Sequence, residues 1–193
     1  GTLFGVPTRD LQAGLATQRP FMLETQGGVV PLNFRRGNTD TLLINFHGAV
    51  DKTKRTLPVF PPHFPFGAPQ PHQLAISDPT MLLPGEFGIG WYAGHEGFDT
   101  QAAVQHIVRE CAQLLGGAPQ LIFTGGSAGG FAALEASWHF NDSYAVVAGA
   151  QTNLDRYGPS RLPGYRKAAW PGLDPASPLQ DVTCANLCKL YTN

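Results

Sequence analysis

Short apolar runs along the chain predict the strands of a β-sheet. The runs at residues 42–46 and 121–124 are almost continuously apolar, which is typical of strands buried on both faces of a parallel sheet. Two runs near the N-terminus flank Gly27-Gly28, so we predict an antiparallel hairpin at the sheet edge. The predicted strands cover residues 21–24, 29–32, 42–46, 74–78, 121–124, 144–148 and 185–191.

Two segments between these strands have helical spacing. Apolar residues recur at positions 104, 107, 108, 111 and 115, after a predicted N-cap at Asp99 and before Gly116-Gly117. A second helix is predicted from Ser127 to about His139. Because strands and helices alternate, we predict the α/β fold class, with a mostly parallel sheet and helices on both faces. The segments 51–73, 79–98 and 153–180 are predicted to be long loops.

Composition and charge limit the function classes. The 193 residues, 42% of them hydrophobic, suit a single domain over residues 1–193. The formal net charge is −1 and only 14% of residues are charged, so we expect no nucleic-acid partner and no anionic membrane partner. No apolar stretch approaches the roughly 20 residues that span a bilayer, and the N-terminus has no signal pattern. We expect a cytoplasmic protein, and leave a mature secreted form open.

The three cysteines do not form a recognisable disulfide or zinc pattern. Cys111 falls on the apolar face of the first predicted helix, where we expect a core residue. Cys188 lies in the last predicted strand and Cys184 directly before it; along an extended chain they are too far apart for a disulfide, so we expect free thiols. No cluster of cysteine and histidine has ligand spacing, and we expect neither a metal nor a cofactor.

The motif with the clearest chemistry is Gly125-x-Ser127-x-Gly129, between a buried strand and a helix. This context is typical of a nucleophile elbow, in which a sharp turn exposes the serine hydroxyl at the carboxyl edge of the sheet. A side chain at either glycine would collide with neighbouring backbone. A phosphate-binding turn is the alternative, but the chain has neither the Lys-Ser/Thr ending of a P-loop nor a G-x-G-x-x-G spacing.

Backbone amides beside this serine are candidates for an oxyanion hole. The amide of Ala128 lies at the start of the helix, where N–H groups have no partner within the helix. His47-Gly48-Ala49 follows another central strand, and the amide of Gly48 or Ala49 would donate the second hydrogen bond. The alternative is a turn that simply ends the strand.

These segments, in this order, resemble the α/β-hydrolase superfamily: strand and His-Gly, strand and Ser-Asp-Pro, Gly-Trp-Tyr-Ala-Gly, strand and Gly-Gly-Ser-Ala-Gly-Gly. The resemblance covers roughly residues 20–192. More narrowly, residues 90–94 and Gln-Thr-Asn at 151–153 resemble bacterial hydrolase-like proteins of capsular polysaccharide synthesis and of accessory secretion of glycosylated adhesins. This narrower resemblance implies acyl chemistry on a glycan or a cell-surface conjugate.

In this fold the catalytic acid and then the histidine follow the serine along the chain. The only histidine after Ser127 is His139, twelve residues along the same helix and therefore about 18 Å away, too far to act as the base. We therefore expect the sequence to be truncated, with a further strand and a histidine loop encoded after Asn193. Without a base, the serine would be a poor catalyst.

Other residues remain alternative members of the site. His47 and His95 both follow strands at the carboxyl edge, and either could serve as base in an atypical dyad. Asp155, after the strand that follows the serine, could be the acid, or simply a loop carboxylate beside Arg156.

Trp91 and Tyr92 are predicted to overhang the serine, where they would stack on a sugar or line an acyl pocket. Packing under a long loop is the alternative.

Two functions are consistent with these features. The first is a serine hydrolase or acyltransferase that acts on a small-molecule or glycan ester. The second is a catalytically inactive hydrolase-like module in a polysaccharide-biosynthesis or secretion assembly. In either case the last predicted strand would leave an unpaired sheet edge, which we expect a separate C-terminal fragment or a second copy to cover.

Overall fold

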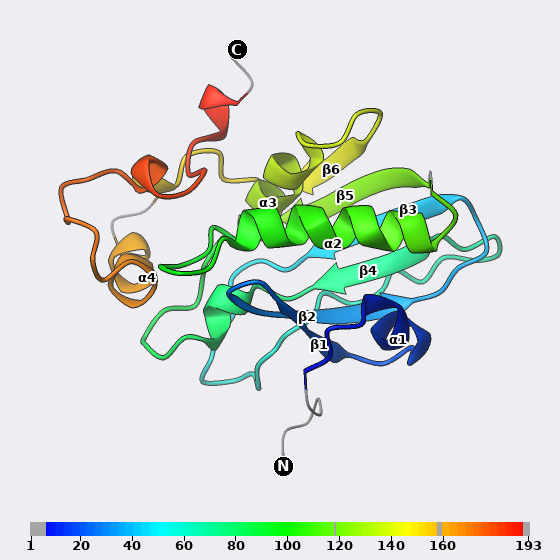
Figure 1. The fold of residues 1–193 in the computed structure, drawn as a ribbon. Helices are drawn as coiled ribbons and strands as arrows, with labels where there is room; N and C mark the ends of the chain where they lie inside the picture. Colours follow the sequence, from blue (N-terminus) through cyan, green and yellow to red (C-terminus); the bar gives the residue numbers. More distant parts are fainter. Residues whose placement is uncertain (1–6, 118, 158–159, 191–193) are drawn as a thin grey trace.

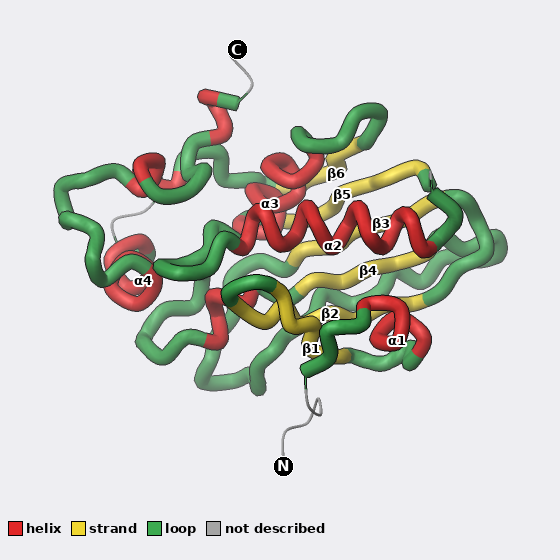
Figure 2. The backbone as a smooth tube through the Cα atoms, viewed as in Figure 1, coloured by secondary structure: helices red, strands yellow, loops and turns green. Residues whose placement is uncertain are grey.

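A six-stranded, mostly parallel sheet forms the centre of the protein (Figures 1 and 2). The computed structural model describes residues 7–117, 119–157 and 160–190. The strand order is β1-β2-β4-β3-β5-β6; β1 and β2 pair antiparallel, as do β2 and β4, and the remaining pairs are parallel. The strands are β1 (Phe21–Thr25), β2 (Gly28–Arg35), β3 (Thr41–Phe46), β4 (His72–Ile76), β5 (Gln120–Gly126) and β6 (Tyr144–Ala148).

The six predicted strands before residue 150, the edge hairpin and both long helices are confirmed. The hairpin closes at the pair Thr25 and Gly28, and Gly27 adopts φ +86°, a left-handed conformation that glycine reaches without steric cost. Helix α2 (Thr100–Leu114) is capped by Asp99, whose carboxylate accepts a hydrogen bond of 2.9 Å from the amide of Ala102.

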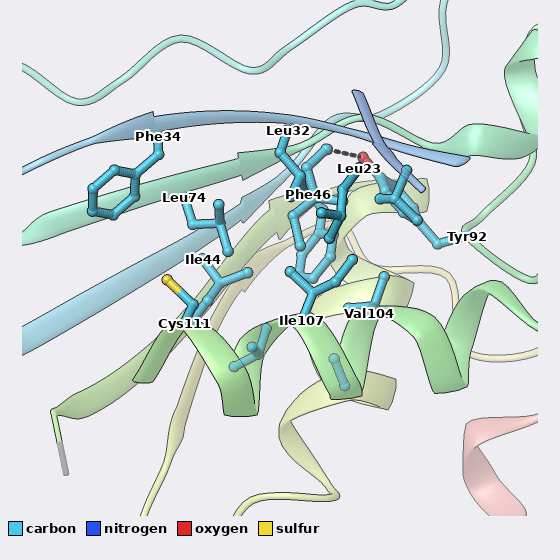
Figure 3. Packing of buried hydrophobic residues seen from close by; sticks show 14 of the residues in the cluster. Leu23, Leu32, Phe34, Ile44, Phe46, Leu74, Tyr92, Val104, Ile107 and Cys111 are labelled. Carbon is cyan, nitrogen blue, oxygen red and sulfur yellow. Dashed lines mark hydrogen bonds between the residues drawn. The ribbon is translucent and has the colours of Figure 1, made fainter. Parts of the chain in front are cut away.

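Within the described residues, the three helices that pack on the sheet lie on the same face. They are α1 (Leu11–Ala16), α2 and α3 (Ala128–Ser137). Side chains of β2, β3 and β4 meet the apolar stripe of α2 in one buried cluster, in which Ile44, Leu74 and Ile107 are fully buried (Figure 3). Cys111 belongs to this cluster, as expected of a core residue.

The opposite face has a different cover from the one expected. We predicted helices on both faces, but over the described residues the proline-rich segment between β3 and β4 lies against this second face. The side chain of Asn45 donates to the carbonyl of Pro62 (3.3 Å), and Gln73 both accepts from the amide of Phe64 (2.7 Å) and donates to its carbonyl (3.0 Å). Prolines cannot donate the hydrogen bonds of a helix, so side-chain amides of the sheet fix this segment instead.

The remaining helical turns lie beyond the carboxyl ends of the parallel strands, as the position of α4 shows (Figure 1). Helix α4 (Leu162–Ala169) arises within a predicted loop and packs Tyr165 against Phe87 and Trp91 in a second buried cluster. Four short 3-10 helices are also described: Pro79–Leu82, Leu154–Arg156, Leu179–Asp181 and Leu187–Lys189.

The predicted strand at residues 185–191 is wrong. Residues Leu187–Lys189 form a 3-10 turn, because the side chain of Asn186 accepts a hydrogen bond from the amide of Cys188 and bends the chain. Residue 191 lies outside the described residues. Among the described strands β6 is therefore the edge beside β5, and its Tyr144 and Val146 are 62% and 64% exposed.

Candidate active site

Ser127 lies in a sharp turn between β5 and α3, at the carboxyl edge of the sheet. Its backbone has φ 55° and ψ −117°, a conformation that residues with a side chain rarely adopt. The flanking glycines make this turn sterically possible. A Cβ at Gly125 would lie 2.2 Å from the carbonyl oxygen of Gly129, and a Cβ at Gly129 would lie 2.4 Å from that of Phe46. The local geometry is that of a tight strand-to-helix turn, called the elbow below.

The loop after β3 lies directly beside this turn. A Cβ at Gly48 would lie 3.7 Å from the Cβ of Ser127 and 3.3 Å from the carbonyl oxygen of Gly126. Ala128 is the first residue of α3, so its amide has no acceptor within the helix. The fold thus brings Gly48, Ser127 and Ala128 together from two separate segments.

His47 is buried beneath this loop, and both of its ring nitrogens are engaged. Nε2 accepts a hydrogen bond of 3.0 Å from the amide of Asp78, so Nδ1 carries the proton and donates to the carbonyl of Gly48 at 2.6 Å. Burial lowers the pKa of His47, although the bond to Gly48 and the nearby Asp78 partly oppose the shift. The ring therefore holds the Gly48–Ala49 peptide in one orientation and is not directed at Ser127.

Tyr92 and Asp78 hold the ends of β3 and β4 together. The Tyr92 hydroxyl accepts from the amide of His47 (2.9 Å) and donates to the carbonyl of Ile76 (2.7 Å). The Asp78 carboxylate accepts from the amides of Tyr92 (2.9 Å) and Thr80 (3.0 Å). Burial raises the pKa of both Asp78 and Tyr92. Tyr92 thus contributes to the support of the site and not to an exposed aromatic wall.

Trp91 is also buried, only 1% exposed, and reaches the serine through an intermediary. Its indole N–H donates to Oε1 of Gln151, and Nε2 of Gln151 lies 2.8 Å from Oγ of Ser127. Our sequence reasoning did not include Gln151 among the site residues. The only signals were its position just after the strand that follows the elbow and its place in the Gln-Thr-Asn motif.

Neither His95 nor Asp155 contacts Ser127. Nδ1 of His95 lies 2.9 Å from the carbonyl of Glu96, and its ring packs on Phe98. The Asp155 carboxylate accepts from the amide of Leu179 (3.0 Å) and lies 3.7 Å from the guanidinium of Arg166. Across the described part of the chain, no histidine ring forms a hydrogen bond with the Ser127 hydroxyl.

His139, at the far end of α3, contacts a carboxyl group instead. His139 follows the end of α3, and its Nε2 lies 3.0 Å from Oε1 of Glu135, a buried side chain of that helix. Burial, reinforced by Asp99, raises the pKa of Glu135 to about 7. Neither His139 nor Glu135 forms a hydrogen bond with Ser127.

The described residues contain neither a metal site nor a membrane-spanning helix. Within residues 7–117, 119–157 and 160–190, no group of three or more metal-binding side chains has the geometry to hold an ion. In the same residues no helix is both long and apolar enough to cross a membrane.

The strand order and the elbow after β5 together define an α/β fold of the α/β-hydrolase type. A mutant of the capsule O-acetyltransferase of Neisseria meningitidis serogroup A in complex with CoA is similar in structure, with a TM-score of 0.54 and 18% identity, over 78% of this chain and 63% of that one. The Glycosylation Associate Protein (Gap123) complex from Streptococcus agalactiae matches with a TM-score of 0.53 and 17% identity, over 70% of this chain and 24% of that one.

The chain therefore spans less than two thirds of the length of these solved structures. No protein-family model and no curated protein matches the sequence. At these identities the structural likeness establishes the fold alone.

Proposed function

We propose that Ser127 is the nucleophile of an acyl-transfer site, in a serine hydrolase or acyltransferase that acts on esters. The observation that carries the proposal is the strained backbone of Ser127, held beside Gly48 at the start of α3. Such strain persists only where the surrounding structure enforces it, and it is concentrated at functional sites. The phosphate-binding alternative accounts for the helix start but not for this conformation.

The reaction would follow the usual two steps of acyl transfer. Oγ of Ser127 attacks the carbonyl carbon while its proton passes to a base, and the carbonyl oxygen becomes an oxyanion that accepts from the amides of Ala128 and of Gly48 or Ala49. Collapse of this intermediate expels the leaving alcohol or thiol, which takes up the proton. Water or an acceptor hydroxyl then attacks the acyl-serine and gives its proton to the base; the bond between the acyl carbon and Oγ breaks, and Oγ takes the proton back. Among the described residues, no histidine forms a hydrogen bond with Ser127.

We propose a glycan hydroxyl as the acceptor of the acyl group. One structural neighbour is a capsule O-acetyltransferase in complex with CoA, which favours transfer of an acyl group to a glycan hydroxyl over hydrolysis of a lipid.

The three free cysteines suit a reducing compartment, so we place the protein in the cytoplasm.

The second candidate is a catalytically inactive module of a surface-glycan or secretion assembly. The absence of a described histidine at Ser127 favours it, and a neighbouring structure is a glycosylation-associated complex. In this case the exposed edge strand β6 would meet a partner chain or a second copy.

Labelling with a fluorophosphonate probe separates the two candidates, provided that the longest natural form of the protein is used. Wild-type protein should be labelled on the peptide that contains Ser127, and Ser127→Ala should abolish the label. Ser137→Ala, at the other end of α3, is the matched control and should keep it. A folded protein that is never labelled would favour the inactive module.

Incubation with an acetyl thioester and an oligosaccharide tests the acceptor. An acetylated Ser127 peptide, followed by acetyl transfer to the sugar, is the expected result. Release of acetate alone would indicate a hydrolase.

A further inference from the structure

Gln151 is the side chain that contacts the Ser127 hydroxyl, and the fold fixes it firmly. The amide of Ser127 donates to the carbonyl of Ala148 at 2.9 Å, so the elbow is attached to the end of β6. A Cβ at Gly130 would lie 3.0 Å from the Cα of Ala150, which places the next residues directly against the first turn of α3. The backbone of Gln151 therefore has little freedom relative to Ser127.

Trp91 fixes the rotation of the Gln151 side-chain amide. Its indole is buried and packs edge to face against Tyr157 and Tyr165, with ring centroids 5.9 and 5.5 Å away. The indole N–H can only donate, so the atom of Gln151 that faces it must be the carbonyl oxygen. The amide nitrogen must then face Ser127.

This orientation determines the role of the serine hydroxyl. Nε2 of Gln151 donates to Oγ of Ser127 across 2.8 Å, so Oγ is an acceptor in this bond. A hydroxyl has one proton to donate, and that proton remains free to point elsewhere. Gln151 cannot take up the proton, because its amide nitrogen is not basic.

We infer that Gln151 is a catalytic residue that donates to Oγ as negative charge develops there, and that Trp91 is the positioning residue that holds it in the donating orientation. The two hydrogen bonds that connect Trp91, Gln151 and Ser127 are called the relay below. The catalytic role of Gln151 rests on the proposed function of Ser127, but the existence of the relay does not. In the attack step the Oγ–H bond breaks, its proton goes to the base, and its electron pair forms the bond to the acyl carbon. Gln151 keeps both of its protons throughout. Donors aimed at developing charge are among the larger contributions to catalysis.

The first experiment tests the relay without any chemistry. In ¹⁵N-labelled protein, the Trp91 indole signal is assigned by its loss in Trp91→Phe, and the Gln151 side-chain amide signal by its loss in Gln151→Met. We expect Ser127→Ala to shift the Gln151 amide signal and Gln151→Met to shift the Trp91 indole signal. If Ser127→Ala leaves the Gln151 amide signal unchanged, the relay is absent and the inference is overturned.

The second experiment measures how fast a fluorophosphonate probe labels Ser127. Gln151→Met keeps the length of the side chain but removes the donor, and should slow labelling by about 10²-fold. Because the lost donor is neutral, the slowing should be the same from about pH 6 to about pH 9. In Gln151→Glu the labelling rate should fall further as the pH rises, since the carboxylate repels the negative charge that develops on Oγ. Trp91→Phe should have an intermediate effect, and Gln26→Met, in the exposed hairpin turn, should have none.

The two measurements separate failure of the inference from failure of the proposed function. Labelling of Gln151→Met at the wild-type rate would remove Gln151 from catalysis, even if the relay is present. If wild-type protein is never labelled, the proposed nucleophile fails and with it the catalytic role of Gln151, while the NMR signals still decide the relay.

Discussion

Replacing Ser127 by glycine should make the protein more stable than replacing it by alanine. The backbone of Ser127 has φ 55° and ψ −117°, where a Cβ is strained by about 1–3 kcal/mol and glycine is not. Both replacements remove the hydroxyl and its bond to Gln151, so that loss cancels in the comparison. Glycine also loses more conformational entropy on folding than alanine, by about 0.5–1 kcal/mol, which acts in the opposite direction.

A control substitution in a helix separates the backbone strain at residue 127 from the entropy cost of glycine. Ala102 is exposed in α2, and Ala102→Gly should destabilise the protein by about 1 kcal/mol. Subtracting this control from the alanine-to-glycine difference at residue 127 should leave about 1–3 kcal/mol in favour of glycine. The assay is urea denaturation followed by circular dichroism, with equal m-values as the condition for comparing midpoints. If glycine destabilises position 127 as much as it does position 102, the elbow is not strained and the main support for the nucleophile is lost.

Two further predictions concern packing and titration around α3. Gly129→Ala should lower the free energy of unfolding by about 1–3 kcal/mol, because its Cβ would lie 2.4 and 2.8 Å from the carbonyl oxygens of Phe46 and His47. Gly67→Ala, whose Cβ would have nothing within 4 Å, should lower it far less. Equal losses of stability in urea denaturation would contradict this packing. Glu135 has its pKa raised to about 7 by burial, so the protonated form favours folding at low pH and this contribution is lost as the pH rises through 7. Glu135→Gln should therefore gain about 3 kcal/mol relative to wild type between about pH 4 and about pH 8, and a constant difference would show that Glu135 does not titrate in this range.

Much of the fold follows from short-range sequence patterns. The buried strands, the hairpin and α2 depend on apolar periodicity, turn glycines and the Asp99 cap, and all of these act over a few residues. The elbow at Ser127 was predicted for the same reason, because the glycine spacing reports a local steric requirement.

Patterns of this kind failed where a distant contact decided the conformation. The run at 185–191 is apolar enough for a strand, yet Asn186 bends it and Leu187 donates its amide to the carbonyl of Thr152 at 2.8 Å. The sequence of the proline-rich segment between β3 and β4 did not predict that it covers a sheet face, because its contacts are hydrogen bonds to side chains of these two strands.

The sequence by itself determined where the six strands of the sheet, α2, α3 and the elbow lie, since those depend on neighbouring residues. Only the tertiary structure decided what each side chain at the site does. His47 looked like a candidate base, but its ring is held by Gly48 and Asp78. Gln151 is distant from Trp91 in sequence and carries no catalytic signature of its own, yet its side-chain amide lies between the Trp91 indole and the Ser127 hydroxyl, because β6 ends beside the elbow. Hydrogen-bond partners depend on the packing of whole elements, which residue spacing along the chain does not encode.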